Sequence, residues 1–217
     1  MKKRSGKQVN ARKGTRVRRK RPSTAVAVPL RNTVFLVGFM GAGKTSVGRA
    51  LGQHLNWVFE DLDDRIERRE GRTVAEIFRD SGESAFRKAE HSALQQVLEE
   101  LRGGVARVMA LGGGAFVQEE NAALLAAAGV PTVFLDAPVE ELWQRCRQQA
   151  NEAGAERPLL SSKDQFRELY DTRRRSYLKA GLRTESGART VDAIAAEIAQ
   201  ALGLKAIATR IEQGEGE

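Results

Sequence analysis

The chain is poor in cysteine and has no long apolar run, and both absences exclude classes of protein. The single cysteine, Cys146, rules out an internal disulfide and fits a reducing compartment. No apolar stretch approaches the roughly 20 residues that a helix needs to cross a bilayer. The N-terminus also lacks the apolar segment of a secretory signal. These absences predict a cytoplasmic protein with no membrane partner.

Acidic residues are missing from the first part of the chain. Residues 1–28 contain 11 Lys and Arg residues and no Asp or Glu, whereas the whole chain has a formal charge of +8. The remainder has a net charge of −3, from 25 basic and 28 acidic residues. Because residues 1–28 also lack apolar periodicity, we predict a basic disordered tail. Weak binding to polyanions and an organellar transit peptide are both open for it.

The remaining length suits one α/β domain, at residues 29–205, and a flexible C-terminal tail at 206–217. Short runs of branched and aromatic residues predict strands at Thr33–Val37, Trp57–Phe59, Val105–Leu111, Pro131–Leu135 and Leu182–Glu185. Apolar residues at helical spacing predict helices at Ser46–Leu55, Arg65–Glu70, Val74–Arg79, Glu83–Leu101, Glu119–Ala128, Val139–Gln149, Lys163–Lys179 and Val191–Leu202. We expect a three-layer α/β/α fold around a mostly parallel five-stranded sheet.

A glycine-rich motif lies between the first predicted strand and helix. Residues Gly38–Thr45 fit the phosphate-binding pattern G-x-x-x-x-G-K-[ST] at every fixed position. The backbone N–H groups of such a loop and the positive end of the next helix attract phosphate, although a plain glycine turn is the alternative. Lys44 would reach the β- and γ-phosphates of a nucleotide, and the Thr45 hydroxyl would hold Mg²⁺. The predicted nucleotide-binding residues of this motif are Gly41, Ala42, Gly43, Lys44, Thr45 and Ser46.

Two acids follow the second predicted strand. Asp61 and Asp63 are two residues apart, so in an extended chain both would project to one side, beside the phosphate-binding loop. That place suits Mg²⁺ and an acceptor hydroxyl. The alternative is that these acids only cap the next helix, a role for which Asp64 is the candidate. Asp136 also follows a strand, but Pro138 comes soon after it, so we rank Asp136 below Asp61 as a metal residue.

Basic residues and glycines complete the predicted site. Arg87 and Glu90 stand at i, i+3 on a predicted helix, where the glutamate can orient the guanidinium, although such pairs are usually solvated. Gly112–Gly114 follow a predicted strand and allow a ligand to approach the backbone, although a plain loop is the alternative. Residues 150–158 are polar or small and lack periodicity, which predicts a mobile lid, at about 150–162, that carries Arg157.

Taken in order, these motifs resemble those of the shikimate kinases, small phosphate-loop enzymes of the nucleoside-monophosphate-kinase type. The resemblance covers about residues 33–202. It rests on Gly38–Thr45, Phe59–Asp63, Phe86–Glu90, Leu111–Ala115 and Arg157–Leu160. The resemblance implies a P-loop kinase fold with a lid. It also implies transfer of the γ-phosphoryl group of ATP to the 3-hydroxyl of shikimate, with Mg²⁺, on the way to chorismate and the aromatic amino acids.

The same resemblance implies roles on the acceptor side. Arg87 and Arg173 would bind the carboxylate of shikimate, and Glu90 would hold Arg87 in place. Three adjacent arginines, Arg173–Arg175, leave open which of them faces the substrate. Asp63 would contact the ring hydroxyls and orient or accept the proton of the attacking oxygen. Further contacts with the ring would come from the Gly113 and Gly114 backbones and from Phe78 and Phe86.

On the nucleotide side, the resemblance implies a metal site and two catalytic cations. Asp61 would support Mg²⁺ through water, alongside Thr45. Lys44 and the lid residue Arg157 would neutralise charge on the transferred phosphoryl group. Arg145 would pack on the adenine ring.

Two other functions compete with this interpretation. A gluconate or nucleotide kinase would keep the phosphate-binding loop and the lid arginine without requiring the acceptor-side residues. A nucleic-acid-binding ATPase, suggested by the basic tail, would bind in a strongly salt-dependent way and lose function when residues 1–28 are deleted. The shikimate kinase interpretation predicts a monomer that needs no nucleic acid for catalysis.

Overall fold

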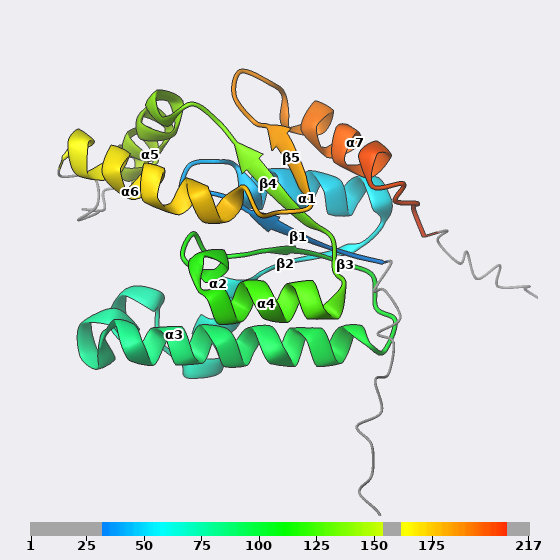
Figure 1. Cartoon of the computed structure of the whole chain (residues 1–217), viewed down its shortest axis with the longest axis horizontal. Helices are drawn as coiled ribbons and strands as arrows, with labels where there is room; N and C mark the ends of the chain where they lie inside the picture. The colour runs from blue at the N-terminus through cyan, green and yellow to red at the C-terminus, as the bar shows by residue number, and fades with distance from the viewer. Residues whose placement is uncertain (1–31, 154–161, 208–217) are drawn as a thin grey trace, which may run out of the picture.

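The computed structural model describes residues 32–153 and 162–207 (Figure 1). This part contains five strands, seven α-helices and one 3-10 helix. The strands are β1 (Thr33–Val37), β2 (Val58–Asp61), β3 (Arg107–Ala110), β4 (Thr132–Asp136) and β5 (Leu182–Glu185). The helices are α1 (Lys44–Leu55), α2 (Leu62–Glu70), α3 (Val74–Leu101), η1 (Ala115–Val117), α4 (Glu119–Ala128), α5 (Val139–Ala153), α6 (Lys163–Tyr177) and α7 (Val191–Ala201).

The sheet is parallel throughout the described residues, with strand order β2-β3-β1-β4-β5. Its centre is β1, where Leu36 pairs with Ala110 of β3 and with Val133 of β4. Every residue of β1 is buried, as is typical of a parallel strand covered on both faces. After β1 the chain crosses to β2 on one side of the sheet. After the neighbouring strand β3 it crosses to β4 on the other side, so the crossover direction reverses between β1 and β3. Ligands bind at such switch points, at the carboxyl ends of the strands.

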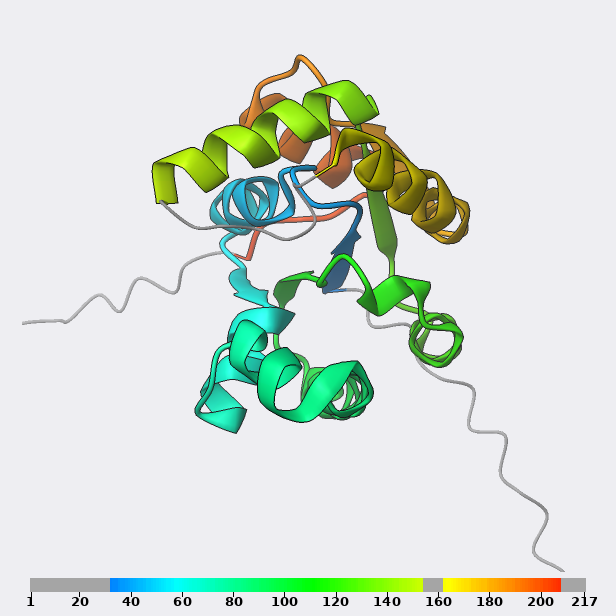
Figure 2. The ribbon, with the colours of Figure 1, turned by 90° about the vertical axis from the view of Figure 1, so that its left-hand side faces the viewer.

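Helices cover both faces of this sheet and give the three predicted layers. On one face α1 packs against α7, and on the other α3 packs against α4 (Figure 1). Helices α5 and α6 lie toward the carboxyl ends of the strands, and Figure 2 views the molecule from that side. The predicted fold class is confirmed. No helix in the described ranges is long and apolar enough to cross a membrane.

The boundary between β2 and α2 differs from the prediction. β2 continues to Asp61, and α2 begins at Leu62 instead of Arg65. The side chain of Asp61 accepts the N–H of Asp63 and caps the helix, so the assignment of the cap to Asp64 was wrong. Asp61 and Asp63 therefore do not alternate along an extended strand, because one is the cap and the other lies in the first helical turn.

The other helices follow the prediction with some differences in extent. Gly82, within α3, has non-helical angles of φ 79° and ψ 171°, so α3 consists of two helices that meet at a kink, as the predicted break at Gly82 requires. Helix α5 continues to Ala153, so the first part of the predicted lid at 150–162 is helical. Arg157 and the rest of that lid at 154–161 lie outside the described residues, as does the predicted basic tail at 1–28.

Candidate active site

The loop between β1 and α1 has the backbone that a phosphate-binding loop requires. Gly41 and Gly43 have φ values of 78° and 89°, in the left-handed region that other residues rarely adopt. A Cβ at Gly41 would also lie 2.9 Å from Sγ of Cys146, so this position excludes a side chain. Ala42 is buried between these glycines, and Ser46 is exposed in the first turn of α1.

Lys44 follows this loop, and its ammonium group turns back onto it. The Nζ atom donates to the carbonyl oxygens of Gly38, at 3.0 Å, and Phe39, at 3.1 Å. Burial lowers the pKa of Lys44, whereas the charges of Asp61 and Asp63 oppose that effect. Phosphate oxygens are stronger partners for an ammonium group than neutral carbonyls, so the loop and its lysine fit the β- and γ-phosphates of a nucleotide.

Thr45 and Asp61 form the pair that suits a metal ion. The Thr45 hydroxyl donates to Oδ2 of Asp61 at 3.1 Å. The other Asp61 oxygen accepts the N–H of Asp63 at 3.1 Å. Burial raises the pKa of Asp61, and these two hydrogen bonds act against the rise. Mg²⁺ commonly takes one or two oxygen groups from a protein and completes its shell with water and phosphate, so this pair fits it.

Asp63 points at the loop that follows β3. A Cβ at Gly112 would lie 2.6 Å from Oδ1 of Asp63, so the absence of a side chain lets loop and carboxylate touch. This Oδ1 atom is buried and has no hydrogen-bond partner among the described residues. Burial raises the pKa of Asp63 to about 6, and the charge of Asp61 adds to the rise. A buried carboxylate oxygen without a donor is costly, so the site fits a ligand hydroxyl at this atom.

Arg87 is held on α3 by two glutamates. Its guanidinium donates to Glu90 at 3.0 and 3.2 Å and to Glu83 at 3.0 and 3.2 Å. The Glu90 side chain is buried, and that of Glu83 is exposed. The predicted Arg87–Glu90 pair is therefore part of a buried site and not a solvated surface pair.

Two aromatic rings and a glycine lie beside the Arg87 guanidinium. The guanidinium carbon lies 5.2 Å from the centre of the Phe86 ring and 6.0 Å from that of Phe78. A Cβ at Gly114 would lie 2.5 Å from Nη1 of Arg87, so a side chain here would displace the guanidinium from the loop. The structure thus brings Arg87, Gly114 and the two predicted ring walls together.

The three adjacent arginines of α6 have three different surroundings. Arg173 faces the glycine loop, since a Cβ at Gly113 would lie 3.5 Å from its Nη1. Arg174 instead pairs with Asp136 at 2.6 Å. Arg175 is exposed and lines a surface hollow on the outer side of α6. Successive helical residues are about 100° apart, so only one of the three can face the site.

Asp136 and Arg145 complete the predicted residues. Asp136 is buried and is bound by arginines and by the Tyr170 hydroxyl, which agrees with its low rank as a metal residue. Arg145 donates to the carbonyl oxygens of Gly41, at 3.4 Å, and Ser186, at 3.0 Å. This position beside the phosphate-binding loop suits a contact with adenine, which stays a prediction.

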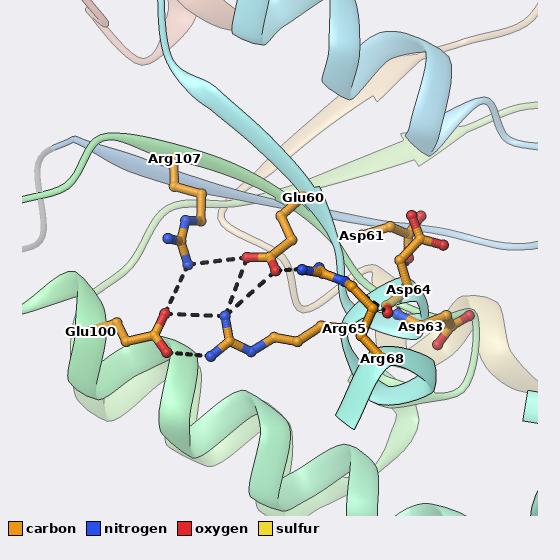
Figure 3. A network of polar contacts seen from close by, with 8 residues as sticks. All are labelled: Glu60, Asp61, Asp63, Asp64, Arg65, Arg68, Glu100 and Arg107. Atoms are coloured by element: carbon orange, nitrogen blue, oxygen red, sulfur yellow. Dashed lines mark hydrogen bonds and ion pairs between the residues drawn. The ribbon is translucent and has the colours of Figure 1, made fainter. Parts of the chain in front are cut away.

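A network of ion pairs fixes the strand and helix that carry the two acids (Figure 3). Glu60, at the end of β2, pairs with Arg68 at 2.7 Å and with Arg107 of β3 at 3.1 Å. Glu100 of α3 pairs with Arg107 at 3.2 Å and also with Arg65 of α2. The network therefore ties two strands and two helices together behind the candidate metal site.

Replacing Glu60 with glutamine is expected to lower the free energy of unfolding by about 2 kcal/mol, because the mostly buried guanidinium groups of Arg107 and of Arg65, which lies 3.4 Å from Glu60, lose a charged partner. Urea unfolding measures this difference. The control is Glu99→Gln, at an exposed position of α3 outside the network. Equal stability of the two variants would contradict the role of the network.

Glu90 is expected to make the protein less stable as the pH rises from about 4.5 to 7. Burial raises the pKa of Glu90 from 4.5 to about 7, against the lowering effect of Arg87. The folded protein thus holds this proton more tightly than the unfolded chain does. The resulting contribution to stability is complete below pH 4.5 and is lost as the pH rises through about 7. The charged groups that act on Glu90 are Arg87, Asp63 and Arg173.

Urea unfolding at several pH values tests this expectation. The Glu90→Gln variant lacks the titrating group, so its unfolding free energy falls less than that of the wild type between about pH 4.5 and 7. Glu83→Gln, which removes the exposed partner of Arg87, keeps the wild-type slope. The same slope in Glu90→Gln as in the wild type would refute the assignment.

Sequence reasoning missed two side chains that shape the site. Tyr177 is buried and donates its hydroxyl to the carbonyl oxygen of Gly113. Glu83 is the second partner of Arg87. Both stand four residues from a predicted site arginine on the same helix, Tyr177 from Arg173 and Glu83 from Arg87, and that spacing was the available signal.

Comparisons with known proteins agree with this geometry. The family model described as "Shikimate kinase" matches residues 40–203. Two similar proteins are the shikimate kinases of Cereibacter sphaeroides and Persephonella marina. The first is 42% identical over 83% of this chain and 87% of its own length, and the second is 35% identical over 76% and 95%.

Solved structures show the same similarity. The structure of shikimate kinase from Acinetobacter baumannii in complex with shikimate is 34% identical, with a TM-score of 0.70. The match covers 83% of this chain and 97% of that one. The resemblance inferred from the motifs is therefore confirmed, and the chain belongs to the shikimate kinase family.

Proposed function

We propose that this chain transfers the γ-phosphoryl group of ATP to the 3-hydroxyl of shikimate. The observation that carries the proposal is the partnerless Oδ1 atom of Asp63, which lies against the glycine loop that Arg87 and Arg173 also approach. Shikimate is a small ring with one carboxylate and several hydroxyls, so it needs cations at one end and an acceptor of hydrogen bonds at the other. The Acinetobacter baumannii relative, described in complex with shikimate, supports this substrate.

On the acceptor side, Arg87 and Arg173 are proposed to bind the substrate carboxylate. Glu90 and Glu83 fix the orientation of Arg87 before any ligand arrives, which lowers the entropic cost of binding. The absence of side chains along Gly112–Gly114 lets the ring lie against the backbone. The ring is thereby turned so that a hydroxyl faces Oδ1 of Asp63.

In the chemical step, the acceptor oxygen forms a bond to the γ-phosphorus, and the bond from that phosphorus to the β–γ bridging oxygen breaks, which releases ADP. Asp63 takes the proton of the attacking hydroxyl; with a pKa of about 6 its carboxylate is mostly ionised at neutral pH. Lys44 stabilises negative charge on the transferred group. Arg157, outside the described residues, is proposed to supply a second cation from the lid.

Thr45 and Asp61 are the residues that would hold Mg²⁺. When bound, the ion supplies positive charge to the phosphate oxygens. The adjacent phosphate-binding loop, with Gly41 and Gly43 in left-handed conformations, would hold the phosphates beside it. A cytoplasmic location and a monomeric state stay predictions.

The proposal is tested by coupled ADP release with Mg-ATP and four acceptor conditions, namely shikimate, gluconate, nucleoside monophosphates and no acceptor. Release that requires shikimate is the expected result. Release with gluconate or a nucleotide instead would refute the acceptor site while leaving the phosphate-binding loop intact. Release without any acceptor would favour an ATPase.

A further inference from the structure

We propose that Tyr177 is a positioning residue of the acceptor site, because it fixes the peptide between Gly113 and Gly114 so that the Gly114 N–H is presented to the acid substrate. The inference rests on the proposed function and assigns a further residue to the same reaction. Tyr177 itself does not touch the substrate. It acts through the backbone of the glycine loop.

The Tyr177 hydroxyl has a defined place at the end of α6. The side chain is fully buried, and its hydroxyl donates to the carbonyl oxygen of Gly113. Its ring packs against Phe134 of β4, with 5.3 Å between the ring centres, so the side chain has no free rotation. Burial raises the pKa of Tyr177 to about 12, so the hydroxyl keeps its proton and remains a donor at all working pH values.

Peptide geometry links this hydrogen bond to the substrate side of the loop. In a trans peptide the C=O of one residue and the N–H of the next point in opposite directions, and no cis peptide occurs among the described residues. A Gly113 carbonyl held on Tyr177 therefore directs the Gly114 N–H away from α6. If this peptide were turned over, the carbonyl oxygen of Gly113 would lose the Tyr177 hydroxyl as its hydrogen-bond donor.

The Gly114 N–H is itself without a partner in the described part of the chain. Gly114 is buried, and its N–H donates to no backbone or side-chain acceptor at residues 32–153 or 162–207. Buried backbone donors are almost always bonded, and an unbonded one is costly. A Cβ at Gly114 would lie 2.5 Å from Nη1 of Arg87, so the unused donor lies beside a guanidinium. The Gly114 N–H and the Arg87 guanidinium together suit a carboxylate oxygen.

Tyr177 also shares its part of the glycine loop with one of the two arginines of the acceptor site. Arg173 stands one helical turn before Tyr177, and its positive charge opposes the rise of the tyrosine pKa. Both residues lie against Gly113, since a Cβ there would lie 3.5 Å from Nη1 of Arg173 and 3.8 Å from the Tyr177 hydroxyl. Loss of the hydroxyl therefore loosens the loop against which Arg173 and Arg87 both lie.

The test compares two single-hydroxyl deletions on α6. Tyr177→Phe removes the hydroxyl that donates to the carbonyl oxygen of Gly113. Tyr170→Phe removes another buried hydroxyl, which bonds Asp136 at 3.1 Å and the carbonyl oxygen of Ala137 at 3.2 Å, away from the glycine loop. Steady-state kinetics with shikimate and ATP varied separately, and thermal unfolding of both variants, give the readouts.

The expected result is a rise in the KM for shikimate of about tenfold in Tyr177→Phe, with the KM for ATP within about twofold of wild type. Tyr170→Phe keeps the wild-type KM for shikimate. An unchanged KM for shikimate in Tyr177→Phe overturns the proposal, as does an equal rise in both variants or a parallel rise in the KM for ATP. Wild-type protein that turns over no shikimate would instead refute the proposed function, and this inference with it.

A second measurement needs no variant and remains decisive if Tyr177→Phe does not fold. NMR hydrogen exchange at the Gly114 amide is recorded in wild-type protein with and without shikimate. Shikimate is expected to slow exchange at Gly114. Exchange at Gly114 that is unaffected by saturating shikimate overturns the proposal.

Discussion

Asp63→Asn is expected to lower kcat with shikimate by about 10³-fold, while the KM for ATP changes by less than about threefold. Asparagine keeps the shape of the side chain but cannot accept a proton. The carboxylate lies at the acceptor side, where its Oδ1 atom has no partner among the described residues, so ATP binding does not depend on it. The effect therefore falls on the chemical step.

Steady-state kinetics of Asp63→Asn and Asp64→Asn measure this difference. Asp64 is exposed in the same turn of α2, so its substitution makes the same change of charge outside the site. The control is expected to retain wild-type kcat. A loss of ATP affinity in Asp63→Asn as large as the loss of kcat would show that Asp63 serves the nucleotide instead.

Arg173→Ala is expected to raise the KM for shikimate by about 100-fold, with a smaller change in kcat. Arg173 is the one arginine of Arg173–Arg175 that faces the glycine loop. A hydrogen-bonded ion pair with the substrate carboxylate is lost in this variant, whereas the residues at the phosphate-binding loop are unchanged. The KM for ATP therefore stays close to the wild-type value.

Substitution of the two neighbouring arginines supplies the controls. Arg175 is exposed, so Arg175→Ala should leave both KM values unchanged. Arg174→Ala should reduce stability without a specific effect on shikimate, since Arg174 pairs with the buried Asp136. A larger rise in the KM for shikimate in Arg174→Ala or Arg175→Ala than in Arg173→Ala would overturn the assignment.

Local sequence patterns predicted the helices and strands whose bounds depend on neighbouring residues in the sequence. The bounds of β1, α4 and β5 match the prediction, and the motif at Gly38–Thr45 lies between β1 and the body of α1, as predicted. The boundary at Asp61 was missed because Asp61 and Asp64 are both residue types that can cap a helix. The choice of Asp61 depends on its contact with Thr45, which is 16 residues away in sequence.

The roles of the acceptor-site residues were predicted from the resemblance to the shikimate kinases more than from local sequence patterns. Nothing local distinguishes Arg173 from its two neighbours, because the choice is set by how α6 is rotated against the glycine loop. The ion pairs of Glu60 and Glu100 join residues from four separate elements, so no spacing in the sequence announces them. The role of Tyr177 likewise appears only when α6 and the loop after β3 are brought together.

Phosphorus NMR of the reaction product tests the central claim most directly. Purified protein is incubated with Mg-ATP and shikimate, and the coupling of the new phosphorus signal to ring protons identifies the phosphorylated hydroxyl. A single product with phosphate on the 3-hydroxyl is the predicted result. Phosphate on another hydroxyl, or ATP consumption without a phosphorylated shikimate, would contradict the placement of the acceptor against Asp63.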